Sequence, residues 1–291
     1  MTVTYRFIES ETGNYPTAIL CRLLGVSRSG YYDWKDRPAR QDPLAPKVEN
    51  IFWQNSRRYG SRRIAAEVRD QTVVGRHRIR RLMREQGLEA IQPRRFVPRT
   101  TDSRHGKRMS PNLLLDREIE VDRPRQVIVG DITYLPLRIG RWAYLATWMD
   151  LFSRKILGWQ IADSMTADLV IEALKKAIHR EHLPAGLIVH TDRGGQYVDS
   201  ELRGLIKEKG FEQSMSRADE TYDNAYAESL FSRYKAELLE DGMFVDLEQA
   251  RSETFSYIEA YYNRIRRHSA LGYLSPENFE RAYYQRALDP G

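Results

Sequence analysis

The order of strand-like and helix-like patterns between residues 126 and 239 is the feature that most restricts the fold of this chain. Short β-branched runs bounded by turn residues predict strands over 127–134, 141–151, 156–162, 186–192 and 212–216. Apolar residues at helical spacing predict helices over 166–182, 200–209 and 223–239. The predicted order is therefore three strands, then helix, strand, helix, strand and helix.

This order predicts an α/β domain with an RNase H-like mixed five-stranded sheet, flanked by helices and with its first and fourth strands side by side. We expect this domain to span residues 124–240. The remaining parts are predicted to be an N-terminal helix-turn-helix-like region, a second helix-turn-helix module, a basic linker and a C-terminal helical tail, over 1–40, 44–91, 92–123 and 241–291.

Helix signals occur in pairs before the predicted sheet. An apolar run ends at Gly25, and Ser27 can then cap a second short helix. Farther along, residues 59–61 introduce a helix through Val68, and a turn leads to another helix that ends at Gly87. Both pairs are all-α and fit helix-turn-helix modules.

Five arginines lie within nine positions of the last of these helices. Three of them are spaced i, i+4 and i+8 and form one basic ridge that can lie along a DNA groove, with Arg78 and Arg81 on its flanks. A solvated cationic helix face is the alternative interpretation. The basic linker that follows is expected to order on DNA. The candidate DNA-binding residues of both segments are Arg76, Arg80, Arg84, Arg94 and Arg95.

The charge of the chain is unevenly distributed. Residues 1–120 contain 24 Lys and Arg against 14 Asp and Glu, a net of +10, whereas residues 121–291 contain 22 against 26, a net of −4. A basic first part can bind a polyanion through phosphate contacts, and an acidic second part suits carboxylate chemistry. A random surface bias is the alternative explanation.

Several classes of protein are excluded by composition. No stretch offers the roughly 18 consecutive apolar residues of a membrane span, and the N-terminus lacks the apolar core of a signal peptide. Cys21 is the only cysteine, which excludes an internal disulfide and a thiolate zinc site. We therefore expect a cytoplasmic protein with no membrane partner.

Three acidic residues are candidates for the chemistry. Asp131 lies in the middle of an apolar predicted strand, where an unpaired charge is costly. Asp192 ends a predicted buried strand, just before Arg193 and two glycines. Glu228 lies about a quarter turn from the apolar stripe of the last predicted helix. If the first and fourth strands are neighbours, Asp131 and Asp192 converge and the helix can bring Glu228 to them.

Converging carboxylates repel one another, and a pair of Mg²⁺ ions about 4 Å apart would neutralise them. Lys235 lies seven residues after Glu228, on nearly the same helix face, and can bind a scissile phosphate or the nearby strand. Each carboxylate taken alone also fits a structural role. Asp150 is a competing carboxylate for which we favour a strand-end role, and His190 fits a structural hydrogen bond better than proton transfer.

The C-terminal tail is rich in tyrosine and arginine. We expect its tyrosines to pack within the tail instead of stacking on bases; they are Tyr257, Tyr261, Tyr262 and Tyr273. Three arginines beside them are candidates for a contact with DNA: Arg264, Arg266 and Arg267.

Several of these segments carry a resemblance to a known family. GDITY at 130–134, HTDRGGQY at 190–197 and DNAYAESLF at 223–231 resemble the three parts of a DDE integrase core. The 35 residues between Asp192 and Glu228 match the spacing of its retroviral-integrase branch. YYNR at 261–264 with HSALGYLSPE at 268–277 resembles the C-terminal tail of OrfB transposases of insertion-sequence family three. YGSRRI at 59–64 and RLMRE at 81–85 resemble that family's inserted helix-turn-helix.

The resemblance covers nearly the whole chain. It implies a prokaryotic, nucleoid-associated DNA transposase that cleaves the ends of its element and transfers the 3′ hydroxyl to another phosphodiester. Asp131, Asp192 and Glu228 would be its catalytic and metal-binding triad. The triad would hold two Mg²⁺ ions, for which Mn²⁺ can substitute, and Lys235 would be its basic DNA-binding residue. The implied partners are element-end and target DNA, further copies of the chain, and the product of an upstream frame, OrfA, separate or fused.

Two other functions remain open at this point. A non-catalytic regulator would occupy element ends without cutting them. A general RNase H-type nuclease would use the same carboxylates to cut without joining, although the long basic N-terminal half makes it the weaker alternative.

Overall fold

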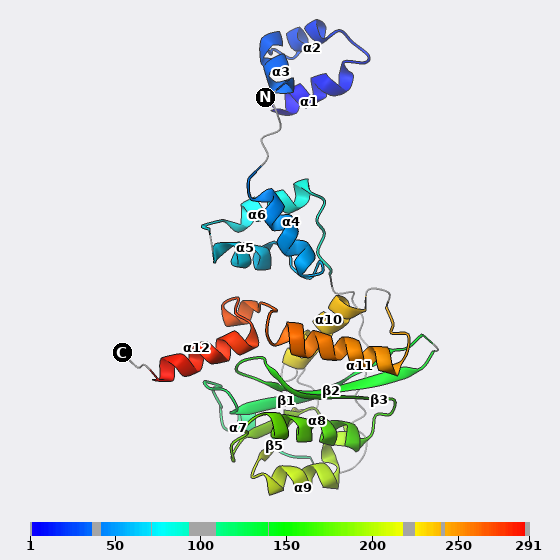
Figure 1. Ribbon diagram of the computed structural model, residues 1–291, viewed down its shortest axis with the longest axis vertical. Helices are drawn as coiled ribbons and strands as arrows, with labels where there is room; N and C mark the ends of the chain where they lie inside the picture. The colour runs from blue at the N-terminus through cyan, green and yellow to red at the C-terminus, as the bar shows by residue number, and fades with distance from the viewer. Residues whose placement is uncertain are drawn as a thin grey trace.

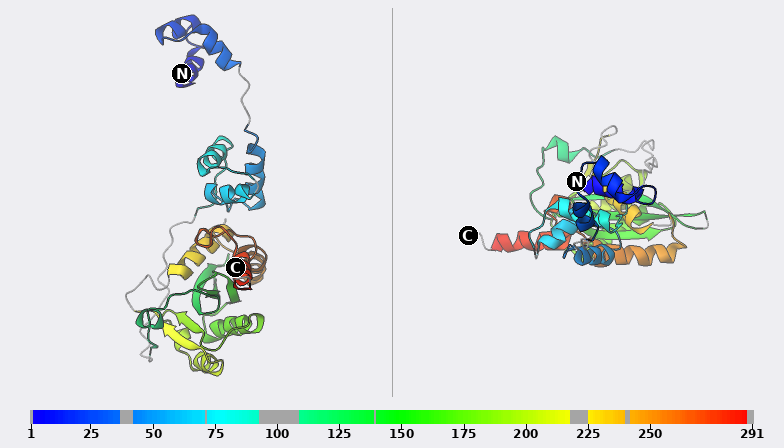
Figure 2. Two further views of the ribbon diagram at one scale, coloured as in Figure 1. Left: turned by 90° about the vertical axis from the view of Figure 1, so that its left-hand side faces the viewer. Right: turned by 90° about the horizontal axis from the view of Figure 1, so that it is seen from above.

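The computed structural model describes residues 2–36, 42–70, 72–92, 109–138, 140–217, 225–239 and 242–288. Figure 1 shows three parts along the longest axis: a small helical unit, a second helical unit, and a sheet covered by helices. The left-hand view in Figure 2 shows the same succession. Within these residues, no helix has both the length and the apolar character needed to cross a bilayer.

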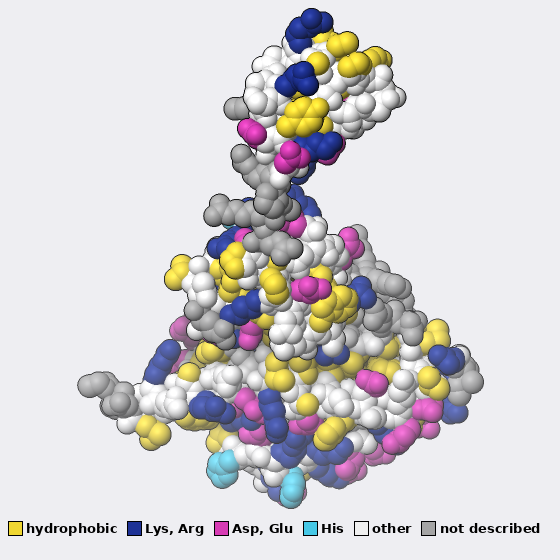
Figure 3. Space-filling model, turned by 45° about the horizontal axis from the view of Figure 1, so that its top comes forward, with side chains coloured by type: hydrophobic (Ala, Val, Ile, Leu, Met, Phe, Trp, Pro, Cys, Tyr) yellow, Lys and Arg dark blue, Asp and Glu magenta, His cyan; other side chains and the backbone are white. Residues whose placement is uncertain are grey.

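The first unit contains three helices, α1 (Thr2–Glu11), α2 (Thr17–Leu23) and α3 (Arg28–Lys35). Ser27 caps α3 as predicted, because its side chain accepts a hydrogen bond from Gly30 N at 3.1 Å. The buried core of the unit consists of Tyr5, Ile8, Leu20, Cys21 and Tyr31. Figure 3 shows that hydrophobic side chains also reach the surface of this unit.

The second unit contains α4 (Ala45–Gln54), α5 (Ser61–Arg69) and α6 (Arg76–Glu85). The apolar stripe predicted on α6 is buried: Ile79, Leu82 and Met83. These residues belong to one continuous apolar core that also includes Val129 of the sheet and Tyr257 of the tail. The second unit is therefore packed onto the rest of the chain.

A single mixed sheet of five strands forms the centre of the third part. Its strands are β1 (Val127–Pro136), β2 (Trp142–Asp150), β3 (Ile156–Ala162), β4 (Ile188–Thr191) and β5 (Glu212–Met215). Their order is β3-β2-β1-β4-β5. The first three strands are antiparallel, while β1 with β4 and β4 with β5 are parallel. The predicted RNase H-like sheet, with its first and fourth strands side by side, is confirmed.

Helices cover both faces of this sheet (Figure 1). On one face, α8 (Ala167–Arg180) and α9 (Ser200–Glu208) enclose a core with residues such as Ile128 and Val189. On the other face, α10 (Ala225–Leu238) and α11 (Leu247–Phe255) pack against Val129 and Leu135. Because β-strand side chains alternate, odd-numbered residues of β1, including Asp131, belong to the α10 face.

The tail continues from α11 into a π-helical segment (Ser256–Tyr262) and ends in α12 (Pro276–Leu288). A further short helix, α7 (Leu113–Asp116), precedes the sheet. Three tail tyrosines are buried as predicted: Tyr257, Tyr261 and Tyr262. The expectation that Arg266 contacts DNA is wrong, because its side chain is 4% exposed and paired with Glu237. Arg267 likewise pairs with Glu67 and Asp70.

Candidate active site

The candidate site is built on the register between β1 and β4. Gly130 of β1 pairs with Thr191 of β4 in parallel register, at the last pair of that ladder. The residue that follows each of these partners is an aspartate: Asp131 within β1 and Asp192 just past the end of β4. Because parallel strands run in step, the two carboxylates leave neighbouring strands at the same depth. The structure thus brings these two predicted residues together.

The backbone before Asp131 is held very close to the aromatic ring of Trp148 on β2. A Cβ atom on Gly130 would lie 2.3 Å from this ring, so only glycine fits there. Trp148 is itself fixed, because its indole Nε1 donates to the carbonyl of Val170 on α8 at 3.0 Å. Asp131 is partly buried, and its Oδ1 accepts a hydrogen bond from Ile132 N at 2.8 Å.

The backbone of the loop after β4 holds the Asp192 carboxylate in place. Asp192 Oδ1 accepts a hydrogen bond from Gly194 N at 2.9 Å, a turn that folds the chain back over the carboxylate. Arg193 donates from Nε to the carbonyl of Ser216 at 2.8 Å, which ties the loop to the end of β5. A short 3-10 helix, η1 (Gly195–Val198), follows. The partly exposed Asp192 carboxylate is therefore preorganised.

The helix α10 lies against β1 and carries the remaining predicted residues. Lys235 is half-buried; burial lowers the pKa of its ammonium group, and the Asp131 carboxylate opposes that shift, so its pKa lies below the usual range. Lys235 thus lies within the field of Asp131. Glu228 lies on the same helix, two turns earlier, and its side chain is outside the described residues.

Tyr197 is a neighbour of the site to which the sequence assigns no role. It is buried on η1, and burial followed by the Asp131 and Asp192 carboxylates raises the pKa of its phenol well above the usual value. Its ring packs edge-on against Trp148, with 6.0 Å between the ring centroids. The hydroxyl has no hydrogen-bond partner among the residues that the structure describes. Its place in the segment HTDRGGQY is the signal that was available in the sequence.

The two competing residues have structural environments. Asp150 is fully buried and accepts hydrogen bonds from Arg125 N at 2.8 Å and from the Ser153 hydroxyl at 2.7 Å. Burial raises the pKa of Asp150 despite these bonds. His190 is buried, with 2.8 Å between its Nδ1 and the Ser214 hydroxyl. Both sequence-based preferences agree with this arrangement.

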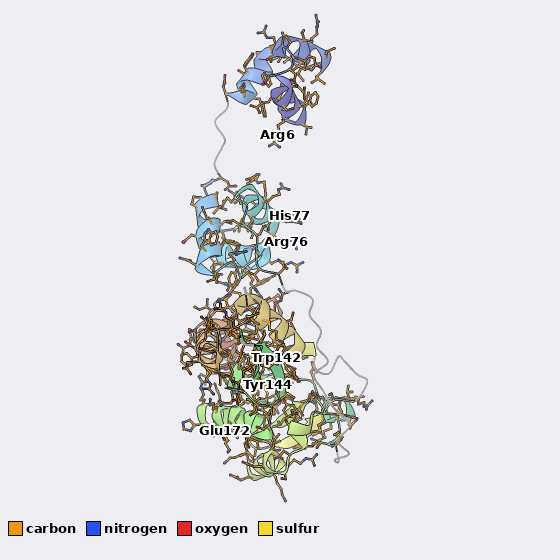
Figure 4. The ribbon with its side chains drawn as sticks, turned by 90° about the vertical axis from the view of Figure 1, so that its right-hand side faces the viewer. Arg6, Arg76, His77, Trp142, Tyr144 and Glu172 are labelled. Carbon is orange, nitrogen blue, oxygen red and sulfur yellow. The ribbon has the colours of Figure 1, made fainter. Side chains whose placement is uncertain are left out.

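The arginines of α6 divide into two groups. Arg78 and Arg81 form ion pairs with Asp42, at 2.7 and 3.0 Å. Arg80 and Arg84 are exposed and, with His77 and Arg81, line a hollow of about 420 Å³. Figure 4 shows Arg76 and His77 on one side of the second unit. Arg80 and Arg84 are therefore cations that a polyanion can reach.

Some predicted residues fall outside the description of the structure. Arg94 and Arg95 of the basic linker lie outside the described residues. Within the described ranges, no group of three or more His, Cys, Asp or Glu side chains is close enough to hold a metal ion. Two members of the predicted triad, Asp131 and Asp192, are described with their side chains.

Comparisons with known families match three segments of the chain. Residues 121–220 match a model of an integrase core domain, and residues 209–276 match a second integrase core domain model. Residues 39–96 match a model of an HTH-like domain.

Individual relatives match along nearly the whole length. The chain is 38% identical over 284 residues to the transposase InsF of insertion sequence IS3A from Escherichia coli K12, covering 95% of this chain and 98% of that protein. It is 38% identical over 274 residues to an uncharacterized 31 kDa protein of insertion element IS600 from Shigella sonnei, covering 92% and 100%. Among solved structures, the HTLV-2 integrase catalytic core domain in complex with magnesium matches with a TM-score of 0.41 and 15% identity, covering 55% of this chain and 99% of that one.

Proposed function

This chain belongs to the IS3 transposase family, and from that premise we propose that it cleaves DNA at insertion-sequence ends and transfers the freed 3′ hydroxyl into DNA. The observation that carries the proposal is the Gly130–Thr191 register, which sets Asp131 and Asp192 on neighbouring strands at one depth. With Glu228 on α10, these residues are the proposed catalytic triad.

The donor set fits divalent metal ions. Both described triad members offer carboxylate oxygens, the ligands that Mg²⁺ prefers, and both are partly buried yet still accessible. We assign Asp131, Asp192 and Glu228 to hold two Mg²⁺ ions, or Mn²⁺ in their place. When bound, the metal activates the attacking oxygen and stabilises the leaving oxygen of a phosphodiester.

The chain's own residues contribute position and charge. The loop from Asp192 to Gly194 fixes one carboxylate by its backbone hydrogen bond at 2.9 Å, so little reorganisation is needed during the reaction. The Lys235 ammonium group interacts electrostatically with the Asp131 carboxylate and can bind the scissile phosphate as a point charge. Water and then a DNA 3′ hydroxyl are the nucleophiles, and no protein side chain becomes covalently attached to DNA.

DNA is held outside the triad by the second helical unit in this proposal. The exposed cations of α6 bind backbone phosphates, and the basic linker extends this contact. The residues assigned to DNA are Arg76, Arg80, Arg84, Arg94, Arg95 and Lys235. Several copies of the chain pair two element ends, and an upstream OrfA product, free or fused, contributes to end recognition.

The test is a reaction of the purified chain, alone and fused to any upstream frame, with DNA that carries its native flanks. Metal-dependent nicks together with joined products support the proposal, provided both disappear in Asp192→Asn and on chelation of the metal. Nicks without joined products in either form would favour a nuclease. Binding without cutting in either form would favour a regulator.

A further inference from the structure

Three segments that are far apart in the sequence meet at one buried carboxylate. Glu237 lies at the end of α10, and its side chain is only 4% exposed. Arg266 of the tail donates to it from Nη2 at 2.8 Å and from Nε at 3.0 Å. The hydroxyl of Tyr257 donates to Oε2 at 2.8 Å. Arg63 of the second helical unit pairs with Oε1 at 3.6 Å.

The second helical unit also holds the backbone at this end of α10. Arg58 donates from Nε to the carbonyl of Glu237 at 3.3 Å, and its guanidinium lies 4.6 Å from the ring centroid of Tyr261. Arg63, at the start of α5, donates from Nε to the carbonyl of Arg267 at 2.9 Å. The unit therefore contacts both α10 and the tail through the same two arginines.

A second group of contacts fixes the unit to the tail. Tyr59 is fully buried; its hydroxyl donates to the carbonyl of Ile265 at 3.2 Å and accepts from Arg267 N at 2.9 Å. The Arg267 guanidinium pairs with Glu67 in the last turn of α5 and with Asp70 just after that helix. This arrangement joins residues about 200 positions apart through main-chain as well as side-chain groups.

The charge on Glu237 is maintained despite its burial. Burial raises the pKa of this carboxyl, but Arg266 and Arg63 more than offset that effect, and its pKa lies below the usual range. A buried charge that loses one partner is left uncompensated, which is strongly unfavourable. The end of α10 is therefore held in a single geometry by the helical unit and the tail together.

We propose that Glu237 is a positioning residue that sets α10, and with it Glu228, from the docked helical unit. Glu237 lies nine residues after Glu228, about 13 Å along the helix, so it acts through the helix and does not touch the reacting atoms. The metal site is then complete only while Arg63 and Arg266 hold this carboxylate. The inference rests on the proposed role of Glu228 in metal binding.

The test compares Glu237→Gln with wild type and with a matched control, Glu181→Gln. Glu181 is a partly buried carboxylate paired with Arg125 and Lys155, and it belongs to a separate ion cluster. For each protein, Mn²⁺ is titrated and the rise in melting temperature is recorded, followed by the Mn²⁺ dependence of DNA nicking. Glu237→Gln should raise the half-saturating Mn²⁺ concentration in both measurements, because α10 then no longer holds Glu228 in place; we expect about 10-fold, the lower end of the loss seen when a group that supports a metal ligand is removed. Glu181→Gln should leave it unchanged.

A second variant keeps the inference testable if Glu237→Gln does not fold. Arg63→Gln removes the ion pair from the helical unit to the Glu237 carboxylate, together with the bonds from Arg63 to the Arg267 and Arg58 carbonyls, and leaves Arg266 on Glu237. It should also raise the half-saturating Mn²⁺ concentration. If both variants fold, combining them should add little, because they break the same link. A folded Glu237→Gln or Arg63→Gln protein with wild-type Mn²⁺ saturation would overturn the inference. Failure of the proposed function would give a different result. In that case Mn²⁺ would change the melting temperature of wild type no more than that of Asp192→Asn.

Discussion

Gly130 and Thr191 are paired in parallel register across β1 and β4, and this pair sets the depth of the two aspartates that follow them. The relationship depends on Gly130, because the ring of Trp148 occupies the space that any side chain there would need. The position of Asp131 is thus tied to the packing of β2 and, through the Trp148 indole, to α8.

Gly130→Ala should lower the free energy of unfolding by about 1–3 kcal/mol, because an overpacked core must shift to accept the extra methyl group. Urea unfolding measures the change. Gly204→Ala is a suitable control, since nothing lies within 4 Å of a Cβ at this exposed position of α9. It should raise stability by about 0.5–1 kcal/mol. Equal stabilities for Gly130→Ala and wild type would contradict the observed closeness of Trp148.

Tyr197→Phe should stabilise the metal-free chain by about 1 kcal/mol, because it removes a buried hydroxyl that has no partner among the described residues. Thermal and urea unfolding in the presence of a chelator are the measurements. A loss of stability of similar size would show that the hydroxyl does have a hydrogen-bond partner in the folded chain.

Arg80→Ala should weaken DNA binding at all sequences and reduce the slope of log affinity against log salt by about 0.9, the contribution of one phosphate contact. The control is Arg117→Ala, an exposed arginine that is paired with Glu212 at β5. Its slope should equal that of wild type. Fluorescence anisotropy between low and moderate salt gives both values, and an unchanged slope for Arg80→Ala would remove α6 from the DNA interface.

The ion pairs of Asp42 should make the stability of the second helical unit depend on acid pH. The hydrogen bond from Arg78, supported by Leu44 N, lowers the pKa of Asp42 from 3.8 to about 2. Because the folded pKa is below the unfolded value, this stabilisation is complete above about pH 4 and is lost as the pH falls towards 2. The difference in melting temperature between wild type and Asp42→Asn should therefore shrink over this interval. In an Arg78→Gln background the difference should already be smaller at neutral pH, with Arg81 and Leu44 N still stabilising the Asp42 carboxylate. A difference independent of pH in the wild-type background would refute the assignment.

The strand order and the meeting of Asp131 with Asp192 could be predicted from the sequence, because β-branched runs and helical periodicity reveal which elements follow one another. In the RNase H-like sheet that this order predicts, the fourth strand lies beside the first. The helix α1 could not be predicted in this way, since its ten residues mix polar and apolar types without a clear stripe.

The ion pairs of Arg266 and Arg267 could not be predicted from the sequence for a different reason. A local run of arginines shows that charge is present, but the acidic partners, Glu237 and Glu67, lie 29 and 200 residues away in the sequence. Nothing in the local pattern distinguishes a buried ion pair from a contact with phosphate. Pairings of this kind depend on the tertiary packing of the helical unit, the tail and α10.

The central claim is that Asp131, Asp192 and Glu228 act as one metal-binding set. The most direct measurement is the rate of joined-product formation with Mg²⁺ for Asp131→Asn, Asp192→Asn and Glu228→Gln, beside Asp199→Asn, a carboxylate that caps α9 and lies outside the set. Each of the first three should lose about 10³-fold or more in rate while remaining folded, and Asp199→Asn should stay near the wild-type rate. A folded triad variant that cuts and joins DNA at the wild-type rate would contradict the claim.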